Sequence, residues 1–213
     1  MAGTLVVSAF EPEIAPLRRL VRGLRQVTLA PVGIGAVDAA IGAARAIAKA
    51  RPRRVIFVGT AGVYAGGGSA GPAVGDVIVS AVVHCVSTAA LAGAGYLPEP
   101  QVTRATPSPA LGRALAAGSL AAAAVACPLA ITRSAGLARR IASSTGASVE
   151  NLEAFAVARA ADTAGVEFAA VLGIANRVGP AAHREWLAHH QEASAAAARV
   201  IAAYLSKRAR QKS

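Results

Sequence analysis

One stretch of the sequence decides the fold: residues 26–62, which read QVTLAPVGIGAVDAAIGAARAIAKARPRRVIFVGTAG. An apolar run at 26–32 ends in two glycines, a helix-forming run follows at 36–50, and a second apolar run at 54–58 ends in Gly59-Thr60-Ala61-Gly62. Strand, helix and strand joined by short glycine turns are typical of a parallel βαβ unit. The stretch therefore predicts an α/β domain with a largely parallel sheet.

The same alternation continues on both sides of this unit. Further strands are expected at 5–9, 77–83, 123–132 and 168–174, and further helices at 12–22, 111–117, 137–144, 151–164 and 184–206. Glycine and proline residues predict loops at residues 66–72 and 87–104. We find no linker and no internal repeat, so one domain over residues 1–213 is expected, with residues 207–213 as a basic, frayed tail.

The composition limits the function classes. Hydrophobic residues make up 54% and charged residues 15% of the chain, which excludes general disorder. The net charge of +11 suits nucleic acid, but aromatic residues are only 4% and the arginines are scattered, so nucleic-acid binding is a minor alternative. Residues 114–132 carry no charge, yet Gly118, Ser119 and Pro128 interrupt them. We expect a cytoplasmic protein without a signal peptide, membrane span or nucleic-acid partner.

Neither the cysteines nor the histidines predict a metal site. Cys85 and Cys127 lie in apolar, strand-like contexts and are expected as small core residues. The histidines of the last helix are spaced too irregularly for metal ligands and are expected on its exposed side: His183, His189 and His190. His84 follows a strand and could belong to the core or to a site. We expect no metal and no cofactor.

The turn Gly33-Ile34-Gly35 has the first two glycines of a dinucleotide-binding fingerprint. It lacks the third glycine, follows the second strand, and has arginines at 51–54 where an acidic residue is expected. A nicotinamide site is therefore disfavoured. A turn packed against a ligand or the sheet remains open, as does a simple tight turn. The same two interpretations hold for Gly59-Thr60-Ala61-Gly62, whose amides could hold a polar ligand edge.

Glu153 lies in an apolar run, residues 149–158, that reads as a buried helix. Locally it is explained as a helix-start acid, with capping groups at Ser148, Glu150 and Asn151. A site residue is the other explanation, because an unpaired buried charge is costly. Polar residues do recur at strand ends, at Glu13, Glu153 and Asn176. Because ligands bind at the carboxyl ends of parallel strands, we favour the site interpretation.

Six segments in order resemble the nucleoside phosphorylase/nucleosidase superfamily: residues 9–13, 32–35, 59–62, 74–80, 151–154 and 173–176. The resemblance covers nearly the whole chain. It implies a three-layer α/β/α fold around a central mixed, barrel-like sheet. It also implies assembly as a homodimer or higher homo-oligomer.

The resemblance assigns chemistry to these segments. Cleavage of an N-glycosidic bond passes through an oxocarbenium-like sugar. By resemblance, Glu13 activates the attacking water, Glu153 holds the ribose hydroxyls, and Asn176 interacts with purine N7. The implied substrate-binding residues are Thr60, Ala61, Gly62, Asn151 and Leu152, with Leu152 packing on the nucleoside.

Two departures from the superfamily pattern narrow the function. Phe57 stands where many bacterial phosphorylases carry a phosphate-binding arginine, and Glu11 and Glu13 would repel phosphate, so water is the expected nucleophile. Asn176 stands where adenine-specific nucleosidases have aspartate, and its amide suits a 6-oxopurine such as hypoxanthine.

Residues 150–153 and 176–179, followed by Trp186, are most similar to the futalosine hydrolase branch of the superfamily. The usual methionine is Leu152 here, and the usual glycine is Ala154. The resemblance thus implies hydrolysis of futalosine to hypoxanthine and dehypoxanthine futalosine, in menaquinone biosynthesis. The alternatives are a methylthioadenosine/S-adenosylhomocysteine nucleosidase, a purine nucleoside phosphorylase, and a nucleoside-binding homologue without catalysis.

Overall fold

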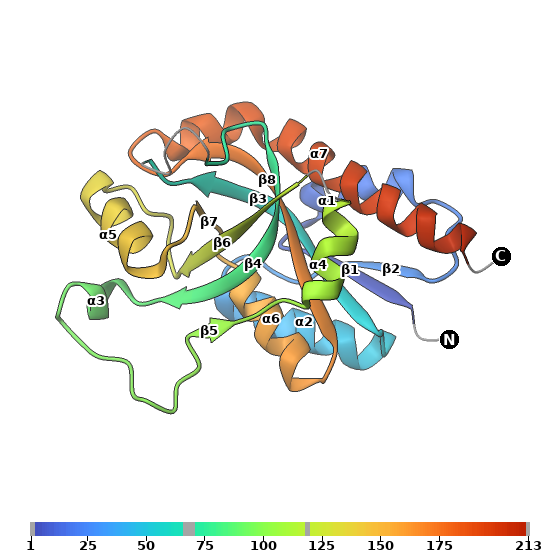
Figure 1. Cartoon of the computed structure of the whole chain (residues 1–213), viewed down its shortest axis with the longest axis horizontal. Coiled ribbons are helices and arrows are strands. Elements are labelled where there is room, and N and C mark those ends of the chain that lie inside the picture. The colour runs from blue at the N-terminus through green and yellow to red at the C-terminus, as the bar shows by residue number, and fades with distance from the viewer. Residues whose placement is uncertain (1–2, 66–70, 118–119, 212–213) are drawn as a thin grey trace.

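The computed structural model of the chain describes residues 3–65, 71–117 and 120–211 (Figure 1). Its strands are β1 (Thr4–Ser8), β2 (Val27–Pro31), β3 (Arg54–Val63), β4 (Val77–Val86), β5 (Arg104–Ala105), β6 (Ala121–Pro128), β7 (Val149–Glu150) and β8 (Glu167–Arg177). Its helices are α1 (Glu11–Leu20), α2 (Ala36–Ala50), α3 (Thr88–Leu91), α4 (Pro109–Ala116), α5 (Ala135–Thr145), α6 (Ala154–Thr163) and α7 (Ala182–Arg210).

The strands form one mixed sheet that closes on itself. Its order is β2-β1-β3-β7-β6-β4-β5, and β8 pairs with both β3 and β4, so β3, β7, β6, β4 and β8 form a closed ring. The β3–β7 and β4–β8 pairs are antiparallel, whereas β1, β2, β3 and β8 run parallel. The expected α/β class with a central mixed, barrel-like sheet is confirmed.

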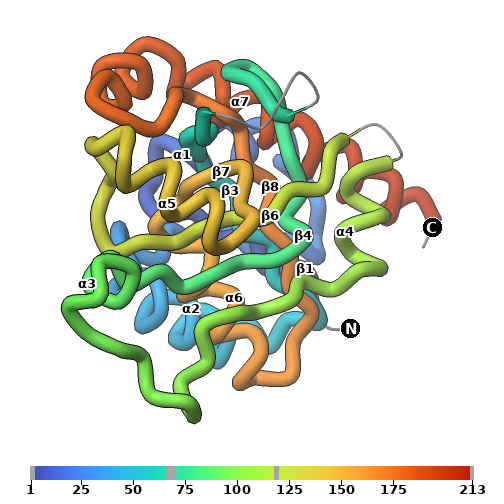
Figure 2. Tube along the Cα trace, turned by 60° about the vertical axis from the view of Figure 1, so that its left-hand side comes forward, coloured from blue at the N-terminus to red at the C-terminus, as the bar shows by residue number. Residues whose placement is uncertain are grey.

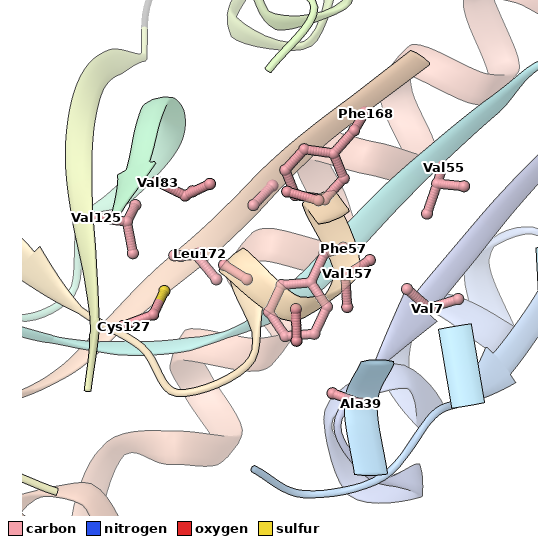
Figure 3. Packing of buried hydrophobic residues seen from close by; sticks show 14 of the residues in the cluster. Val7, Ala39, Val55, Phe57, Val83, Val125, Cys127, Val157, Phe168 and Leu172 are labelled. Carbon is pink, nitrogen blue, oxygen red and sulfur yellow. The ribbon is translucent and has the colours of Figure 1, made fainter. Parts of the chain in front are cut away.

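Helices cover both faces of the sheet, because the strands are apolar on both sides. Val55 and Phe57 of β3 pack into a cluster with α2 and α6 (Figure 3). Ile56 and Val58, which alternate with them, pack into a second cluster with α1, α4 and α7. Burial on both faces is typical of parallel strands under two helical layers. The expected three-layer arrangement is confirmed.

Three strands are longer than expected. β3 continues through Gly59-Thr60-Ala61-Gly62, so the expected turn there is wrong. β8 pairs with β3 to the end, with a register shift between Ala61 and Gly62, and therefore Asn176 lies inside β8. β4 likewise includes His84, which is half-buried. Closure of the barrel continues strand pairing beyond the point where the glycines indicate a turn.

The segment around Glu153 and the end of the chain also differ from expectation. Residues 149 and 150 form strand β7, and α6 begins only after Glu153. Helix α7 continues to Arg210 and so includes residues 207–210 of the expected basic tail. Buried Tyr204 and Leu205 hold this end, and the Arg208 guanidinium lies over the Tyr204 ring. Basic residues in a last helical turn also suit the helix dipole.

The remaining expectations concern loops, thiols and membranes. The segment between α3 and β5 forms a long loop that projects away from the sheet (Figure 2). Residues 66–70 of the expected glycine-rich loop lie outside the described residues, as do Gly118 and Ser119.

Cys85 and Cys127 are free thiols, and Cys127 is buried. Over the described ranges, no helix combines the length and hydropathy needed to cross a membrane.

Candidate active site

A cavity of about 340 Å³ lies at the carboxyl ends of β1, β3 and β8. Its lining includes every site residue predicted from the sequence: Glu13, Thr60, Ala61, Gly62, Asn151, Leu152, Glu153 and Asn176. The structure thus brings together residues from segments far apart in the sequence. Their roles in binding and catalysis stay predictions.

Glu13 is held by one of its two carboxylate oxygens. It lies in the first turn of α1, directly after β1, and is only 4% exposed. Its Oε1 accepts hydrogen bonds from the Thr60 backbone N–H at 3.0 Å and the Thr60 hydroxyl at 2.9 Å. Its Oε2 is buried without a hydrogen-bond partner among the described residues. One oxygen is therefore fixed by two donors, and the other is buried without a donor of its own among the described residues.

The environment of Glu13 raises its pKa to about 7. Burial is the main cause, because it penalises the charged form, and the negative charge of Glu153 adds to it. The two bonds from Thr60 act in the opposite direction, since they favour the carboxylate. A pKa near neutrality suits a group that takes a proton during catalysis.

Asn151 joins Thr60 to the start of α6. Its Oδ1 accepts from the backbone N–H groups of Glu153 and Ala154, at 2.9 and 2.8 Å, and its Nδ2 donates to the Thr60 carbonyl at 3.0 Å. Asn151 therefore caps the helix. The other two expected capping groups, Ser148 and Glu150, do not.

The Glu153 side chain does not cap helix α6, although its position suggests that it would. It occupies the N-cap position but makes no side-chain cap bond. Its Oε1 accepts the Gly35 backbone N–H at 2.9 Å, and burial raises its pKa. Gly35 can present this N–H because it adopts a φ of +81°, which favours glycine. Of the two interpretations of the Gly33-Ile34-Gly35 turn, the structure shows packing against the cavity, which Ile34 lines.

Asn176 lies opposite Gly62 in the β3–β8 ladder. A Cβ atom at Gly62 would come within 2.8 Å of Asn176 Nδ2, so glycine makes room for this side chain. Nδ2 donates to the Arg177 carbonyl at 3.0 Å, and Oδ1 makes no hydrogen bond with the described residues. Asn176 therefore offers the cavity an acceptor in a fixed orientation.

Glu150 was missed as a cavity residue. It is 6% exposed, and its carboxylate accepts from the Thr132 backbone N–H at 2.9 Å and the Tyr64 hydroxyl at 2.7 Å. Burial, followed by the charge of Glu150, raises the pKa of Tyr64 well above its usual range. Strand β7 has two residues, too few to show an alternating pattern, so periodicity could not predict this arrangement.

An aromatic group forms the rim of the cavity. Trp186 packs between His190 and His183, at ring-centroid distances of 4.3 and 6.2 Å, and lies 6.4 Å from Phe10. Its Nε1–H donates to Thr60 Oγ1 at 3.0 Å. The signal for Trp186 was its place in the resemblance, which named no role for it.

The expectation that the histidines of α7 cover its exposed side holds only in part, because His183 is exposed whereas His189 and His190 are half-buried. His183 lines the cavity, His190 is half-buried against Trp186, and His189 Nδ1 lies 3.1 Å from the Ala175 carbonyl. The first turns of α7 lie along the cavity, and this orientation cannot be read from spacing. No cluster of three His, Cys, Asp or Glu residues within the described ranges could hold a metal ion.

The cavity is lined by acidic side chains. Its described lining contains three glutamates, Glu13, Glu150 and Glu153, and neither lysine nor arginine. Phe57 is fully buried in the core. Glu11, expected to act with Glu13 against phosphate, is exposed and pairs with Arg18 at 3.0 Å outside this lining. The cavity therefore favours developing positive charge and disfavours anions.

Comparisons with known proteins agree with this architecture. The profile of the phosphorylase superfamily matches residues 10–206. No curated protein matches the chain. Among solved structures, a 5′-methylthioadenosine/S-adenosylhomocysteine nucleosidase from Helicobacter pylori superposes with a TM-score of 0.86 at 17% identity, over 97% of this chain and 99% of that one.

Two further structures are similar over the same extent. The native futalosine hydrolase of Helicobacter pylori strain 26695 has a TM-score of 0.85 at 17% identity and covers 97% of this chain and 98% of its own. The nucleosidase from Neisseria meningitidis, in complex with methylthio-immucillin-A, has a TM-score of 0.82 at 22% identity, covering 97% and 99%. At these identities the likeness establishes a shared fold.

Proposed function

This chain belongs to the phosphorylase superfamily, and on that premise we propose that it hydrolyses the N-glycosidic bond of a purine nucleoside. The observation that carries the proposal is Glu13, a buried carboxylate with a pKa near 7 that lines the cavity. Thr60 fixes one of its oxygens, and the other has no hydrogen-bond partner among the described residues. The solved structures of similar fold include a Helicobacter pylori nucleosidase mutant with 5′-methylthioadenosine in its active site, which supports the same substrate class.

In the proposed mechanism, Glu13 Oε2 takes a proton from water as the water oxygen attacks the anomeric carbon of the sugar. The bond from that carbon to the purine breaks, and the electron pair leaves with the base. Glu153 binds the ribose hydroxyls through the carboxylate oxygen that Gly35 does not occupy. The surrounding carboxylates stabilise the positive charge that develops on the sugar ring.

Water is the proposed nucleophile because the cavity is unsuited to phosphate. Phosphate would lie among three glutamates without any lysine or arginine from the described lining. Like charges in a buried site cost free energy, and here that cost would oppose phosphate binding. Hydrolysis is therefore favoured over phosphorolysis.

For the leaving base we propose a 6-oxopurine, and for the substrate futalosine. Asn176 Oδ1 is free to accept from N7–H of a base that has taken up a proton from solvent. Its second amide N–H can donate to a 6-oxo oxygen, whereas a 6-amino group would meet it donor to donor. A methylthioadenosine/S-adenosylhomocysteine nucleosidase is the competing assignment, since such enzymes share the fold.

The test is release of free purine from futalosine, inosine and methylthioadenosine in phosphate-free buffer. We expect hydrolysis of the two 6-oxopurine nucleosides with preference for futalosine. A preference for methylthioadenosine would contradict the 6-oxopurine assignment. Tight binding of these nucleosides without turnover would instead select the non-catalytic homologue.

The pKa of Glu13 predicts the pH dependence. A general base acts as the carboxylate, and burial raises the pKa of Glu13 from 4.5 to about 7. We therefore expect kcat/KM to fall about tenfold per pH unit below pH 7 and to level off above it. Initial rates between pH 5 and 9, with the protein confirmed as folded at each pH, measure this curve. An acid limb near pH 4.5 would show that Glu13 does not act as the buried base.

We also propose that the protein acts as a homodimer or higher homo-oligomer. Ile34, just before α2, and Val37 and Ile41 in its first turns are large apolar residues that are 62, 69 and 47% exposed. Ile34 also lines the cavity. Association of two copies would bury them. A cytoplasmic location remains an expectation.

A further inference from the structure

One hydroxyl group connects the aromatic rim of the cavity to Glu13. Trp186 Nε1 lies 3.0 Å from Thr60 Oγ1, and that oxygen lies 2.9 Å from Glu13 Oε1. An indole N–H can only donate, and a carboxylate can only accept. The Thr60 hydroxyl therefore accepts from Trp186 and gives its single proton to Glu13.

This polarity makes the two oxygens of Glu13 different. The Thr60 backbone N–H donates to the same Oε1 at 3.0 Å, so Oε1 receives two donors. Oε2 has no hydrogen-bond partner among the described residues. Without the Trp186 N–H, the Thr60 hydroxyl would be free to rotate away from Glu13.

The packing of Trp186 fixes the direction of its N–H. The indole ring lies at 15° to the His190 ring and at 13° to the His183 ring. An indole ring that stacks on two other rings cannot turn without losing these contacts. The N–H is thereby kept on Thr60.

We propose that Trp186 is a positioning residue for the base: it orients the Thr60 hydroxyl and so makes Glu13 Oε2 the atom that takes the proton from water. The inference rests on the proposed function for Glu13 as the base. It adds a role to a residue that otherwise serves as an apolar wall of the cavity.

The titratable groups that line the same cavity as Glu13 are Glu153 from the start of α6, Glu150 from β7 and His183 from α7. The substitution Trp186→Phe leaves these groups and most of the ring stack in place. It removes the N–H together with the five-membered ring that carries it, so the Thr60→Val background below serves to separate the lost donor from the lost ring. A changed titration of Glu13 that is absent in that background therefore reports the loss of the donor.

The experiment compares wild type, Trp186→Phe, Thr60→Val and the double variant. The titration of Glu13 is followed by ¹³C NMR of its carboxyl group in the substrate-free protein, and kcat/KM is measured against pH. Losing a donor to the carboxylate favours its protonated form. We expect Trp186→Phe to move both curves to higher pH by roughly half a pH unit to one unit.

The double variant decides whether Thr60 carries the effect. In the Thr60→Val background we expect Trp186→Phe to add no shift, whereas Thr60→Ser should titrate like wild type. Thr60→Ala replaces Thr60→Val if valine prevents folding. An unchanged Glu13 titration in Trp186→Phe, or an equal shift in both backgrounds, would overturn the proposal. If the wild type hydrolyses no nucleoside, the proposed function fails, and the NMR comparison still decides whether Trp186 orients Thr60.

Discussion

Replacing Glu13 by glutamine is expected to lower kcat for nucleoside hydrolysis roughly 10²–10⁴-fold while the protein stays folded. Glutamine keeps an oxygen that can accept both hydrogen bonds from Thr60. In the wild type these bonds are made to Glu13 Oε1. It places an NH₂ group where Oε2 lies, and an amide cannot take a proton from water. The variant thus removes the base and little else. Steady-state rates at pH 8 measure the loss.

The same variant should be at least as stable as the wild type at pH 8. Folding raises the pKa of Glu13 from 4.5 to about 7, so the folded state binds a proton more tightly than the unfolded state. As pH rises from 4.5 to 7, ionisation of Glu13 therefore reduces stability, and the reduction is complete above pH 7. Glutamine does not ionise. Thermal unfolding at pH 8 is the control, and a folded variant with full activity would show that Glu13 is not the base.

Replacing Asn176 by aspartate is expected to change the preferred base. A carboxylate accepts from both N7–H and a 6-amino group, but it faces the lone pairs of a 6-oxo oxygen with a negative charge. We expect the ratio of kcat/KM for methylthioadenosine to that for inosine to rise about 5- to 150-fold, since one unmatched polar contact is worth about 1–3 kcal/mol. Parallel assays of both substrates with wild type and variant give the ratio.

Asn176→Leu is the matched control, because it fills a similar volume without polar atoms. It should lower kcat/KM for both substrates and bring the ratio of the two kcat/KM values close to one, because leucine favours neither base. Both variants lose the bond from Asn176 Nδ2 to the Arg177 carbonyl, so a loss of stability common to both is attributed to that bond. If Asn176→Asp keeps the wild-type ratio, Asn176 does not read the 6-position of the base.

Much of the cavity could be predicted because topology assembles it. Glu13 follows β1, and Thr60 and Asn176 lie in the carboxyl-terminal halves of β3 and β8. Parallel strands bring these ends to one edge of the sheet. Strong apolar runs and glycines made these strands recognisable. The βαβ stretch at 26–62 then set the arrangement of the rest, and its helix was predicted with the bounds that α2 has.

The remainder depends on contacts between distant segments. Gly59 and Gly62 indicated a turn, but in β3 they admit the Phe57 ring and the Asn176 side chain. Glu150 faces the cavity because closure of the barrel makes a two-residue strand beside β3 and β6. Trp186 reaches Thr60 because of how α7 crosses the sheet. Local periodicity contains none of this information.

The central claim is that water, activated by Glu13, cleaves the nucleoside in a cavity that excludes phosphate. The most direct test incubates the protein with inosine or futalosine, with and without phosphate, and identifies both the purine and the sugar product. The account predicts the same rate in both buffers, with hypoxanthine and the free, unphosphorylated sugar as products. Turnover that requires phosphate and yields a sugar 1-phosphate would contradict it.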